Sequence, residues 1–419
     1  MSQNVFQVIE HTIPAQHIRE YPNGSKNGEA SLQLAIKEYR PLDNLDAPPG
    51  SVTLIGAHAI GCPKECYEAL WEDLYHALKD KSSIRAIWIA DVSNHGASGI
   101  LNEKVQGDDP SWFDHSRDLL HMTNHFRDSM PQPIMGVAHS MGSAQLVHLS
   151  MLHSRLFHSL ALIEPVIQDA APQGPNVAFP SSYRPDFWPS RDDAEAATRK
   201  AKYFRSWDPR VFKKFLGFGL RPTPTAIYPG PEHEGGVTLA TTKHQEAWSY
   251  IRPNFSPMAA NREDRSERLQ APDLSSEDRT HLFTKPEMYL TNQSLPHVRP
   301  HVLWIFGEKS PINTPGGRDD KLKRTGTGVG GNGGASAGQV EAITLPDGQH
   351  MLPLEKTPEV AELLATWLEK QLRDYREVEE WYRANPSGKS DRDMLVLSKA
   401  WMKNIRQKES TPRSVREKL

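Results

Sequence analysis

A serine stands at an abrupt change of pattern in this 419-residue chain. Residues 134–137 have the apolar character of a short buried strand, and a helical pattern begins after the turn that contains Ser140. The small residues Ala138 and Gly142 lie two positions before and two positions after the serine. This spacing is typical of a nucleophile elbow, a tight turn that holds one hydroxyl clear of the sheet, although glycine is usual at both small positions. We therefore predict that Ser140 is a catalytic nucleophile.

A serine hydroxyl attacks well only when a base removes its proton and an acid orients that base. In chains with a strand-elbow-helix nucleophile, the acid and then the histidine follow the serine in the sequence. His350 lies in the loop of residues 345–353, between a predicted strand and the predicted last core helix. We predict that His350 is the base.

Three carboxylates are candidates for the acid. Glu164 ends an apolar strand directly after the nucleophile helix, where a charge is costly unless it is paired. The acid often follows the strand predicted at residues 301–307, but the expected position there holds Ser310, which carries no charge. Glu308 and Asp347 remain alternatives, although either could equally be a solvated loop carboxylate. The sequence favours Glu164.

An oxyanion hole needs two backbone N–H groups directed at the developing negative charge. The residue after the nucleophile, Met141, supplies one. The loop of residues 58–61, which ends an earlier strand, supplies the other, and we select the N–H of Ile60. If Ala59 needed a positive φ, its side chain would cost about 1–2 kcal/mol.

Strands and helices alternate on both sides of the serine. Buried strands are expected at residues 52–57, 84–90, 134–137, 160–164, 301–307 and 340–345, with edge strands at 6–20 and 32–36. Helices are expected at 63–79, 111–126 and from 358 to about 382. This order predicts an α/β fold with a mostly parallel central sheet, whose active groups gather at the carboxyl ends of the strands.

The alternation stops between residues 168 and 298, a segment rich in proline and aromatic residues with one long helix expected at 191–216. An excursion of this length between two strands is interpreted as an inserted cap domain. Its aromatic residues fit either a lipophilic pocket lining or a small core of its own. The predicted organisation is a core of residues 1–167 and 299–382, a cap of residues 168–298, and a charged C-terminal tail of residues 383–419.

The composition excludes several kinds of partner and site. With a formal net charge of −3, the chain gives no reason to expect nucleic acid as a partner. No apolar run reaches the roughly 20 residues that a membrane span requires, and the N-terminus lacks the pattern of a secretory signal. The two cysteines, Cys62 and Cys66, are expected to be reduced thiols of an intracellular protein.

Three further signals are weaker. Residues 326–331 match G-x-G-x-x-G but precede a strand, so we interpret them as a loop and not as a dinucleotide site. The basic residues between 199 and 214 could hold the phosphates of coenzyme A, but a solvated helix face is the favoured interpretation. The final tripeptide, Glu417-Lys418-Leu419, matches the peroxisomal Ser-Lys-Leu address at its last two positions.

Taken together, these motifs resemble the fungal α/β-hydrolases of secondary-metabolite and host-toxin gene clusters. That family includes a peroxisomal acyl-CoA hydrolase of mycophenolic acid biosynthesis and the hydrolases of Alternaria toxin pathways. The matching segments are residues 17–22, 58–65, 84–92, 124–128, 138–142, 164–165, 188–191 and 326–338, together with the His350 loop. The resemblance implies an α/β-hydrolase fold with an inserted cap and a triad at Ser140, Glu164 and His350. In the relative that we compare, the acid is aspartate, so Glu164 is one methylene longer.

The expected activity is hydrolysis of an acyl thioester (acyl-CoA) or an ester of a secondary-metabolite intermediate through an acyl-serine. This chemistry needs no metal or redox cofactor. The same triad would also serve an acyltransferase or a cyclising enzyme, and a non-catalytic binder could keep the fold. Peroxisomal family members imply an import receptor that reads Glu417-Lys418-Leu419, with the cytoplasm as the alternative location, and homodimer formation stays open.

Overall fold

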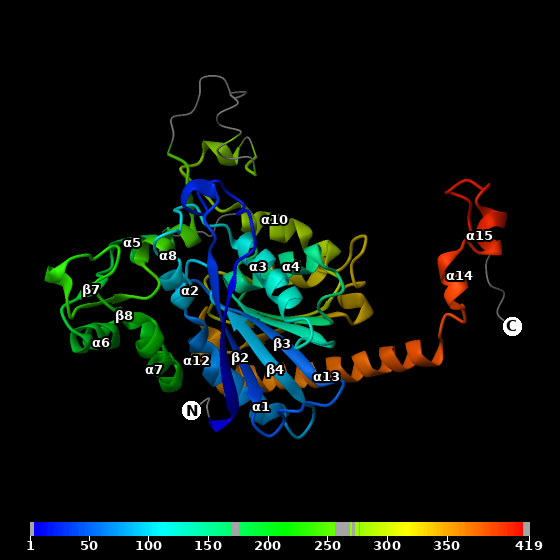
Figure 1. Cartoon of the computed structure of the whole chain (residues 1–419), viewed down its shortest axis with the longest axis horizontal. Coiled ribbons are helices and arrows are strands. Elements are labelled where there is room, and N and C mark those ends of the chain that lie inside the picture. Colours follow the sequence, from blue (N-terminus) through cyan, green and yellow to red (C-terminus); the bar gives the residue numbers. More distant parts are fainter. Residues whose placement is uncertain (1–3, 170–175, 256–268, 270–272, 276, 414–419) are drawn as a thin grey trace. The chain divides into compact units, whose positions relative to one another are not determined.

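An eight-stranded sheet forms the centre of the molecule, in the strand order β1-β2-β4-β3-β5-β6-β12-β13 (Figure 1). The computed structural model describes residues 4–169, 176–255, 269, 273–275 and 277–413. The strands are β1 (Phe6–Pro14), β2 (Gln33–Pro41), β3 (Val52–Ala57), β4 (Ile84–Ala90), β5 (Ile134–His139), β6 (Ser159–Ile163), β12 (His301–Gly307) and β13 (Val340–Leu345). Strand β2 is antiparallel to β1 and β4, and all other neighbours in this sheet are parallel. The predicted mostly parallel α/β architecture is confirmed.

Helices cover both faces of the sheet (Figure 1). Because successive side chains of a strand point to opposite faces, Leu54 packs in a core with α1 (Glu68–Leu78) and α13 (Thr357–Ala384). Its neighbour Ile55 packs in the other core, with α3 (Trp112–His125) and α4 (Met141–Leu152). Strands buried on both sides need continuous apolar runs, which is why β3 and β4 could be located from the sequence.

Further short helices lie in the segments before, between and after the strands of the core. They are η3 (Lys64–Tyr67), α2 (Gly96–Leu101), α11 (Pro315–Arg324), η8 (Ala335–Ala337) and α12 (Leu352–Glu355), with the short η2 (Lys26–Gly28) near the N-terminus. Helix α3 begins where expected, since the side chain of Ser111 accepts a hydrogen bond from the N–H of Phe113.

The connection between β6 and β12 is a set of short elements. It contains α5 (Phe179–Tyr183), β7 (Phe187–Trp188), α6 (Arg191–Lys200), η4 (Lys202–Phe204), α7 (Pro209–Phe218), β8 (Leu220–Pro222), η5 (Pro231–His233), β9 (Val237–Leu239), α8 (Lys243–Tyr250), β10 (Arg252–Pro253), η6 (Asp278–Thr280), β11 (Phe283–Thr284), α10 (Pro286–Ser294) and η7 (Leu295–His297). Strands β7, β9 and β8 form a small antiparallel sheet, and β10 pairs with β11.

The single long helix expected at residues 191–216 was wrong, because the structure has two helices, α6 and α7, in its place. Pro209 cannot continue a helix from the preceding turn but suits a first helical position. Asp208 caps the new helix by accepting a hydrogen bond from the N–H of Arg210.

The described connection contributes to the main core as well as covering it. Helix α10 lies against α4, and Met288, Leu295 and Val298 belong to the same apolar cluster as the buried apolar residues of α4. By its contacts the chain divides into two compact units, residues 1–373 and 374–419, so the insertion belongs to the first. The second unit contains the end of α13, then α14 (Asp391–Leu395) and α15 (Lys399–Asn404). None of the helices within the described residues is both long and apolar enough to span a membrane.

Candidate active site

Ser140 occupies a strained turn between β5 and α4. Its backbone has φ 57° and ψ −118°, values that a residue with a Cβ rarely adopts. A Cβ added at Gly142 would lie 2.4 Å from the carbonyl oxygen of Ala57, so only glycine fits there. On the other side of the serine, the methyl group of Ala138 packs within the apolar core. The two small residues therefore allow the elbow to pack closely against β3.

The structure brings three distant side chains together at the carboxyl ends of the parallel strands. The Oγ of Ser140 lies 2.9 Å from the Nε2 of His350, and the Nδ1 of His350 lies 3.2 Å from the Oε2 of Glu164. Strands β5, β6, β12 and β13 are successive neighbours in the sheet. The loops after β5, β6 and β13, which carry Ser140, Glu164 and His350, therefore lie at the same end of the sheet. This geometry lets a proton move from a hydroxyl to an imidazole that a carboxylate orients.

Glu164 is completely buried, and three further donors surround its carboxylate. Its Oε1 accepts a hydrogen bond from the N–H of Gly307 at 2.6 Å. Its Oε2 accepts hydrogen bonds from the Oγ of Ser310 at 2.5 Å and the Nδ2 of Asn313 at 3.1 Å. Ser310 thus occupies the position where an acid was considered and holds the carboxylate of Glu164 instead. Sequence reasoning did not find Asn313, since nothing local marks it.

The two alternative acids lie away from the histidine. The N–H of Asp347 donates a hydrogen bond to the Oε2 of Glu308 at 3.0 Å, and the carboxylate of Asp347 pairs with Lys309 at 2.5 Å. Both carboxylates are exposed to solvent. The side-chain hydrogen bonds of the His350 ring run instead to Ser140 and Glu164.

The loop of residues 58–61 presents its backbone in a defined orientation. The carbonyl oxygen of Ala59 accepts hydrogen bonds from the Nδ1 of His58 at 2.8 Å and the N–H of Cys62 at 3.3 Å. A trans peptide directs its N–H away from its carbonyl, so the N–H of Ile60 points to the opposite side. The N–H of Met141, at the first position of α4, is free of intrahelical partners by helix geometry.

The side chain of His58 is a feature that sequence reasoning passed over. Its Nε2 accepts a hydrogen bond from the N–H of Val92, which leaves Nδ1 as the donor to Ala59. Burial lowers the pKa of His58, so the ring stays neutral and keeps this tautomer. The strain considered at Ala59 does not arise, because the positive φ of 75° falls on Gly61.

Ser140 is only 5% exposed, and a residue of the insertion contacts the loop that carries His350. The hydroxyl of Tyr203 donates a hydrogen bond to the Sδ of Met351 at 3.4 Å. Tyr203 therefore joins the insertion to the residue after His350. Cys62 and Cys66 are free and buried, and burial raises the pKa of both thiols.

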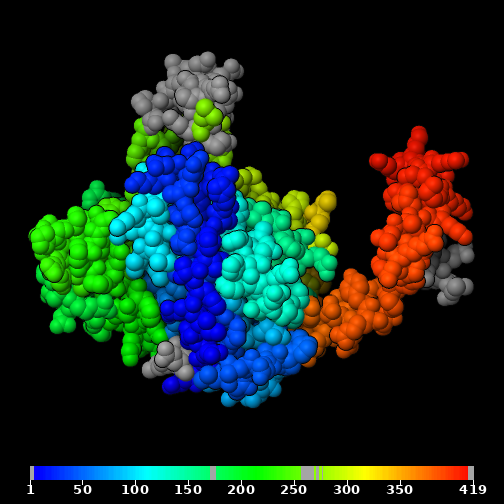
Figure 2. All heavy atoms as spheres, viewed as in Figure 1, coloured from blue at the N-terminus to red at the C-terminus, as the bar shows by residue number. Residues whose placement is uncertain are grey.

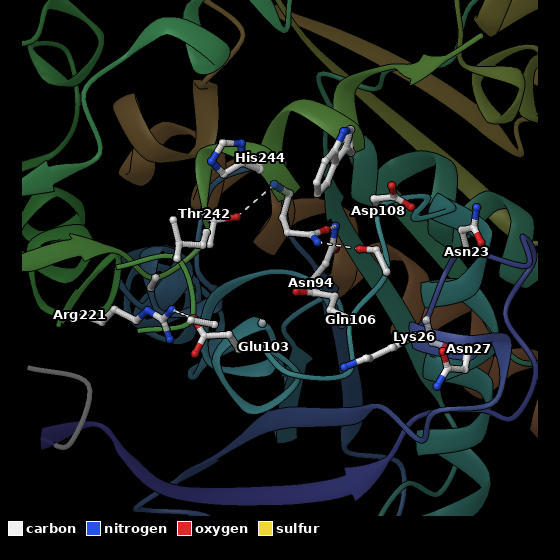
Figure 3. Close-up of a pocket in the computed structure, with 18 residues that line it drawn as sticks. Asn23, Lys26, Asn27, Asn94, Glu103, Gln106, Asp108, Arg221, Thr242 and His244 are labelled. Carbon is white, nitrogen blue, oxygen red and sulfur yellow. Dashed lines mark hydrogen bonds and ion pairs between the residues drawn. The ribbon is translucent and has the colours of Figure 1, made fainter. Parts of the chain in front are cut away.

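A cavity of about 600 Å³ lies where the insertion meets the segment that contains α2 (Figure 3). Figure 2 shows the same junction, between the green insertion and the cyan segment. The two are joined by a hydrogen bond from the N–H of Gly96 to the Oγ1 of Thr241. Ser140, Glu164 and His350 do not line this cavity. Its charged lining residues are Lys26, Arg221, Glu103 and Asp108, so the cavity presents no net positive charge to a phosphate-rich group.

Several of the basic side chains between residues 199 and 214 form ion pairs within the chain. Arg210 binds Asp73 with two hydrogen bonds and also pairs with Asp208. Lys214 pairs with the buried Glu68. The G-x-G-x-x-G segment lies between α11 and β13, so it follows a helix and not a strand.

Three comparisons relate the chain to known proteins. The sequence profile of the alpha/beta hydrolase family matches residues 54–363. The chain is 35% identical to "Type I acyl-CoA thioesterase mpaH'" of Penicillium brevicompactum, over 97% of this chain and 96% of that protein. It is 29% identical to "Abhydrolase domain-containing protein AFT2-1" of Alternaria alternata, over 67% of this chain and 100% of that protein. The solved structure of the peroxisomal alpha-beta-hydrolase Lpx1 of Saccharomyces cerevisiae has a TM-score of 0.69 at 18% identity, covering 94% and 100% of the two chains. The resemblance inferred from the sequence is therefore confirmed.

Proposed function

Because this chain belongs to the alpha/beta hydrolase family and is a hydrolase, we propose that it cleaves an acyl-CoA thioester through a covalent acyl-serine at Ser140. The observation that carries this proposal is the hydrogen-bonded series from the Oγ of Ser140 through His350 to Glu164. The choice of a thioester rests on the relative at 35% identity, which is named an acyl-CoA thioesterase. We extend the proposal to acyl groups of secondary-metabolite intermediates, on the basis of the family resemblance.

The first half of the reaction forms the acyl-serine. The Oγ of Ser140 attacks the thioester carbonyl while the Nε2 of His350 accepts its proton. The N–H groups of Ile60 and Met141 donate hydrogen bonds to the resulting oxyanion. When the tetrahedral intermediate collapses, the carbon–sulfur bond breaks and the imidazolium gives its proton to the leaving thiolate. Glu164 stabilises the imidazolium throughout this half.

The second half releases the acid. Water attacks the acyl-serine, with His350 accepting the proton from water as it previously did from Ser140. The same two N–H groups hold the second oxyanion. Collapse returns the proton to the Oγ of Ser140 and frees the carboxylic acid, so the enzyme is restored.

The test is hydrolysis of a panel of acyl-CoA thioesters and aryl esters by the purified protein and by Ser140→Ala. We expect hydrolysis of at least one thioester with release of free coenzyme A and a carboxylic acid. Loss of the triad nucleophile should lower kcat by about 10⁵- to 10⁶-fold, and fluorophosphonate labelling should occur in the wild type only. Near-normal turnover by Ser140→Ala would remove the acyl-serine mechanism. A wild type that hydrolyses aryl esters alone would remove the thioester assignment.

We also propose that the protein is imported into peroxisomes through Glu417-Lys418-Leu419, a segment that lies outside the described residues. Two of its three positions match the Ser-Lys-Leu address. A fluorescent protein fused ahead of the chain should co-localise with a peroxisomal marker, and removal of the last three residues should disperse it. Unchanged localisation after removal would refute this address.

A further inference from the structure

His139, the residue directly before Ser140, forms a hydrogen bond with each of its ring nitrogens. The Nδ1 of His139 lies 2.8 Å from the hydroxyl of Tyr67, and its Nε2 lies 2.9 Å from the backbone carbonyl oxygen of His350. His139 is fully buried and Tyr67 is 2% exposed. Neither side chain forms part of the Ser140, His350 and Glu164 series, so the proposed reaction leaves their role unassigned.

The direction of each hydrogen bond follows by elimination. A carbonyl oxygen can only accept, so the Nε2 of His139 carries the hydrogen. Burial, with the neighbouring His350 as a second cause, lowers the pKa of His139 to about 3. The ring is therefore neutral, its Nδ1 is an acceptor, and the hydroxyl of Tyr67 must donate to it.

The oxygen of Tyr67 also accepts a hydrogen bond, from the N–H of Ala59 at 2.8 Å. The complete series runs from Ala59 through Tyr67 and His139 to the backbone of His350. It therefore joins the two loops that the proposed mechanism needs at a fixed separation. One loop carries the N–H of Ile60, one peptide beyond the N–H of Ala59, and the other carries the catalytic imidazole. Aligned hydrogen bonds of this kind polarise one another inside a protein.

We propose that Tyr67 and His139 are positioning residues that hold the loop of residues 58–61 and the His350 loop at a fixed separation around Ser140. The proposal rests on the proposed serine hydrolase function. It assigns to His139 a reason for its place in the elbow, since its ring contacts the His350 loop directly and the 58–61 loop through the hydroxyl of Tyr67.

A matched control separates positioning from a general loss of stability. Tyr39, on strand β2, is also fully buried, and its hydroxyl donates one hydrogen bond to the Oε1 of Glu68 at 3.0 Å. Tyr39→Phe and Tyr67→Phe each delete one buried hydroxyl and keep the ring. Only Tyr67→Phe breaks the connection between the two loops.

The first experiment measures kcat, KM, the rate of fluorophosphonate labelling and the Tm of both variants. We expect Tyr67→Phe to lower kcat and the labelling rate by about 10- to 100-fold, because small displacements of reacting groups have effects of this size. The KM of Tyr67→Phe should change by less than roughly threefold, because this substitution removes no group that binds the substrate. Tyr39→Phe should lower the Tm to a similar extent and keep kcat within about twofold of the wild type. Equal loss of kcat in the two variants, or wild-type kcat in Tyr67→Phe, would overturn the proposal.

The second experiment tests whether the two residues act as one series. In His139→Asn the amide can still accept from Tyr67 but does not reach His350, whereas in His139→Gln the longer amide can still donate to the carbonyl of His350. We expect His139→Gln to keep more activity than His139→Asn. The double variant Tyr67→Phe/His139→Asn should lose no more than the worse single variant, because residues of one network are not additive. Multiplicative losses would show independent roles and overturn the proposal.

These outcomes differ from failure of the proposed function itself. If the wild type neither hydrolyses the panel nor reacts with fluorophosphonate at Ser140, both proposals are overturned. If the wild type is active and labelled while the Tyr67 and His139 variants retain its kcat, only the positioning role is overturned.

Discussion

Replacing Glu164 with glutamine is the sharpest test of the acid, since it removes a charge and keeps the shape. With its amide nitrogen at the Oε2 position, the new side chain would leave His350 and Ser310 without an acceptor and would remove one of the two acceptors of Asn313. With the nitrogen at the Oε1 position, only the N–H of Gly307 loses its partner. The second arrangement is favoured, so His350 keeps a neutral acceptor and loses the negative charge.

The magnitude follows from that lost charge. At an effective dielectric constant of about 20, unit charges about 4 Å apart attract by about 4 kcal/mol. Each 1.36 kcal/mol corresponds to roughly a factor of ten in rate. We therefore expect kcat for Glu164→Gln to fall by about 10³-fold, and by up to about 10⁴-fold if the tautomer of His350 also changes. The unpaired N–H of Gly307 should lower the free energy of unfolding by about 1–3 kcal/mol.

The assay is steady-state hydrolysis of one acyl-CoA, with unfolding followed by urea titration. Glu308→Gln and Asp347→Asn are the matched controls, since both remove a carboxylate near the His350 loop that does not contact the ring. Both should keep kcat within about twofold of the wild type. A larger loss of kcat in either control than in Glu164→Gln would refute the assignment of the acid.

Two further perturbations test the elbow and a buried lysine. Gly142→Ala should lower the free energy of unfolding by about 1–3 kcal/mol and slow fluorophosphonate labelling, because its Cβ would lie 2.4 Å from the carbonyl oxygen of Ala57. Gly217→Ala, where an added Cβ meets nothing within 4 Å, should leave the labelling rate unchanged and should not lower the free energy of unfolding, because alanine favours the helix in which this residue lies. Equal behaviour of the two variants would contradict this account. Burial lowers the pKa of Lys321 to about 8, against about 10.5 for an ordinary lysine. Between these pH values the unfolded chain binds more protons than the folded chain, so the free energy of unfolding of the wild type increases as the pH rises. In urea titrations, Lys321→Met should therefore have a higher free energy of unfolding than the wild type at pH 7, and this difference should shrink toward pH 10.5. The control is Lys323→Met, which replaces an exposed lysine. A difference that does not depend on pH, or an equal difference in the control, would contradict the role of burial.

Some elements could be located from the sequence because their causes are local. Strands β3 and β4 have the predicted ends, Val52–Ala57 and Ile84–Ala90, because strands buried on both faces need unbroken apolar runs. The same reasoning failed in the insertion. Strands β7, β8 and β9 have two or three residues each and come from distant segments, so no periodicity could reveal them. Pro209 indicates the break between α6 and α7, but the amphipathic pattern on both sides of it favoured a single helix.

The chain order of serine, carboxylate and histidine restricted the candidates for the site but did not select the acid. Glu164, Glu308 and Asp347 all lie near strand ends, and the cost of an unpaired charge at the end of an apolar strand favoured Glu164. The structure places the carboxylate of Glu164 beside the imidazole of His350, 186 residues further along the chain. The surroundings of that carboxylate depend on the neighbouring positions of β6 and β12. The same adjacency brings Gly307, Ser310 and Asn313 to the carboxylate of Glu164.

The amino-acid sequence by itself determined the strained turn at Ser140, since its requirements are an apolar strand, a following helix and small residues at two fixed positions. Only the tertiary structure decided how the loops of residues 58–61 and 345–353 meet across that turn. The physical reason is that hydrogen bonds such as those of Tyr67 and His139 have a range of about 3 Å. They depend on the placement of whole strands, which no local sequence pattern encodes.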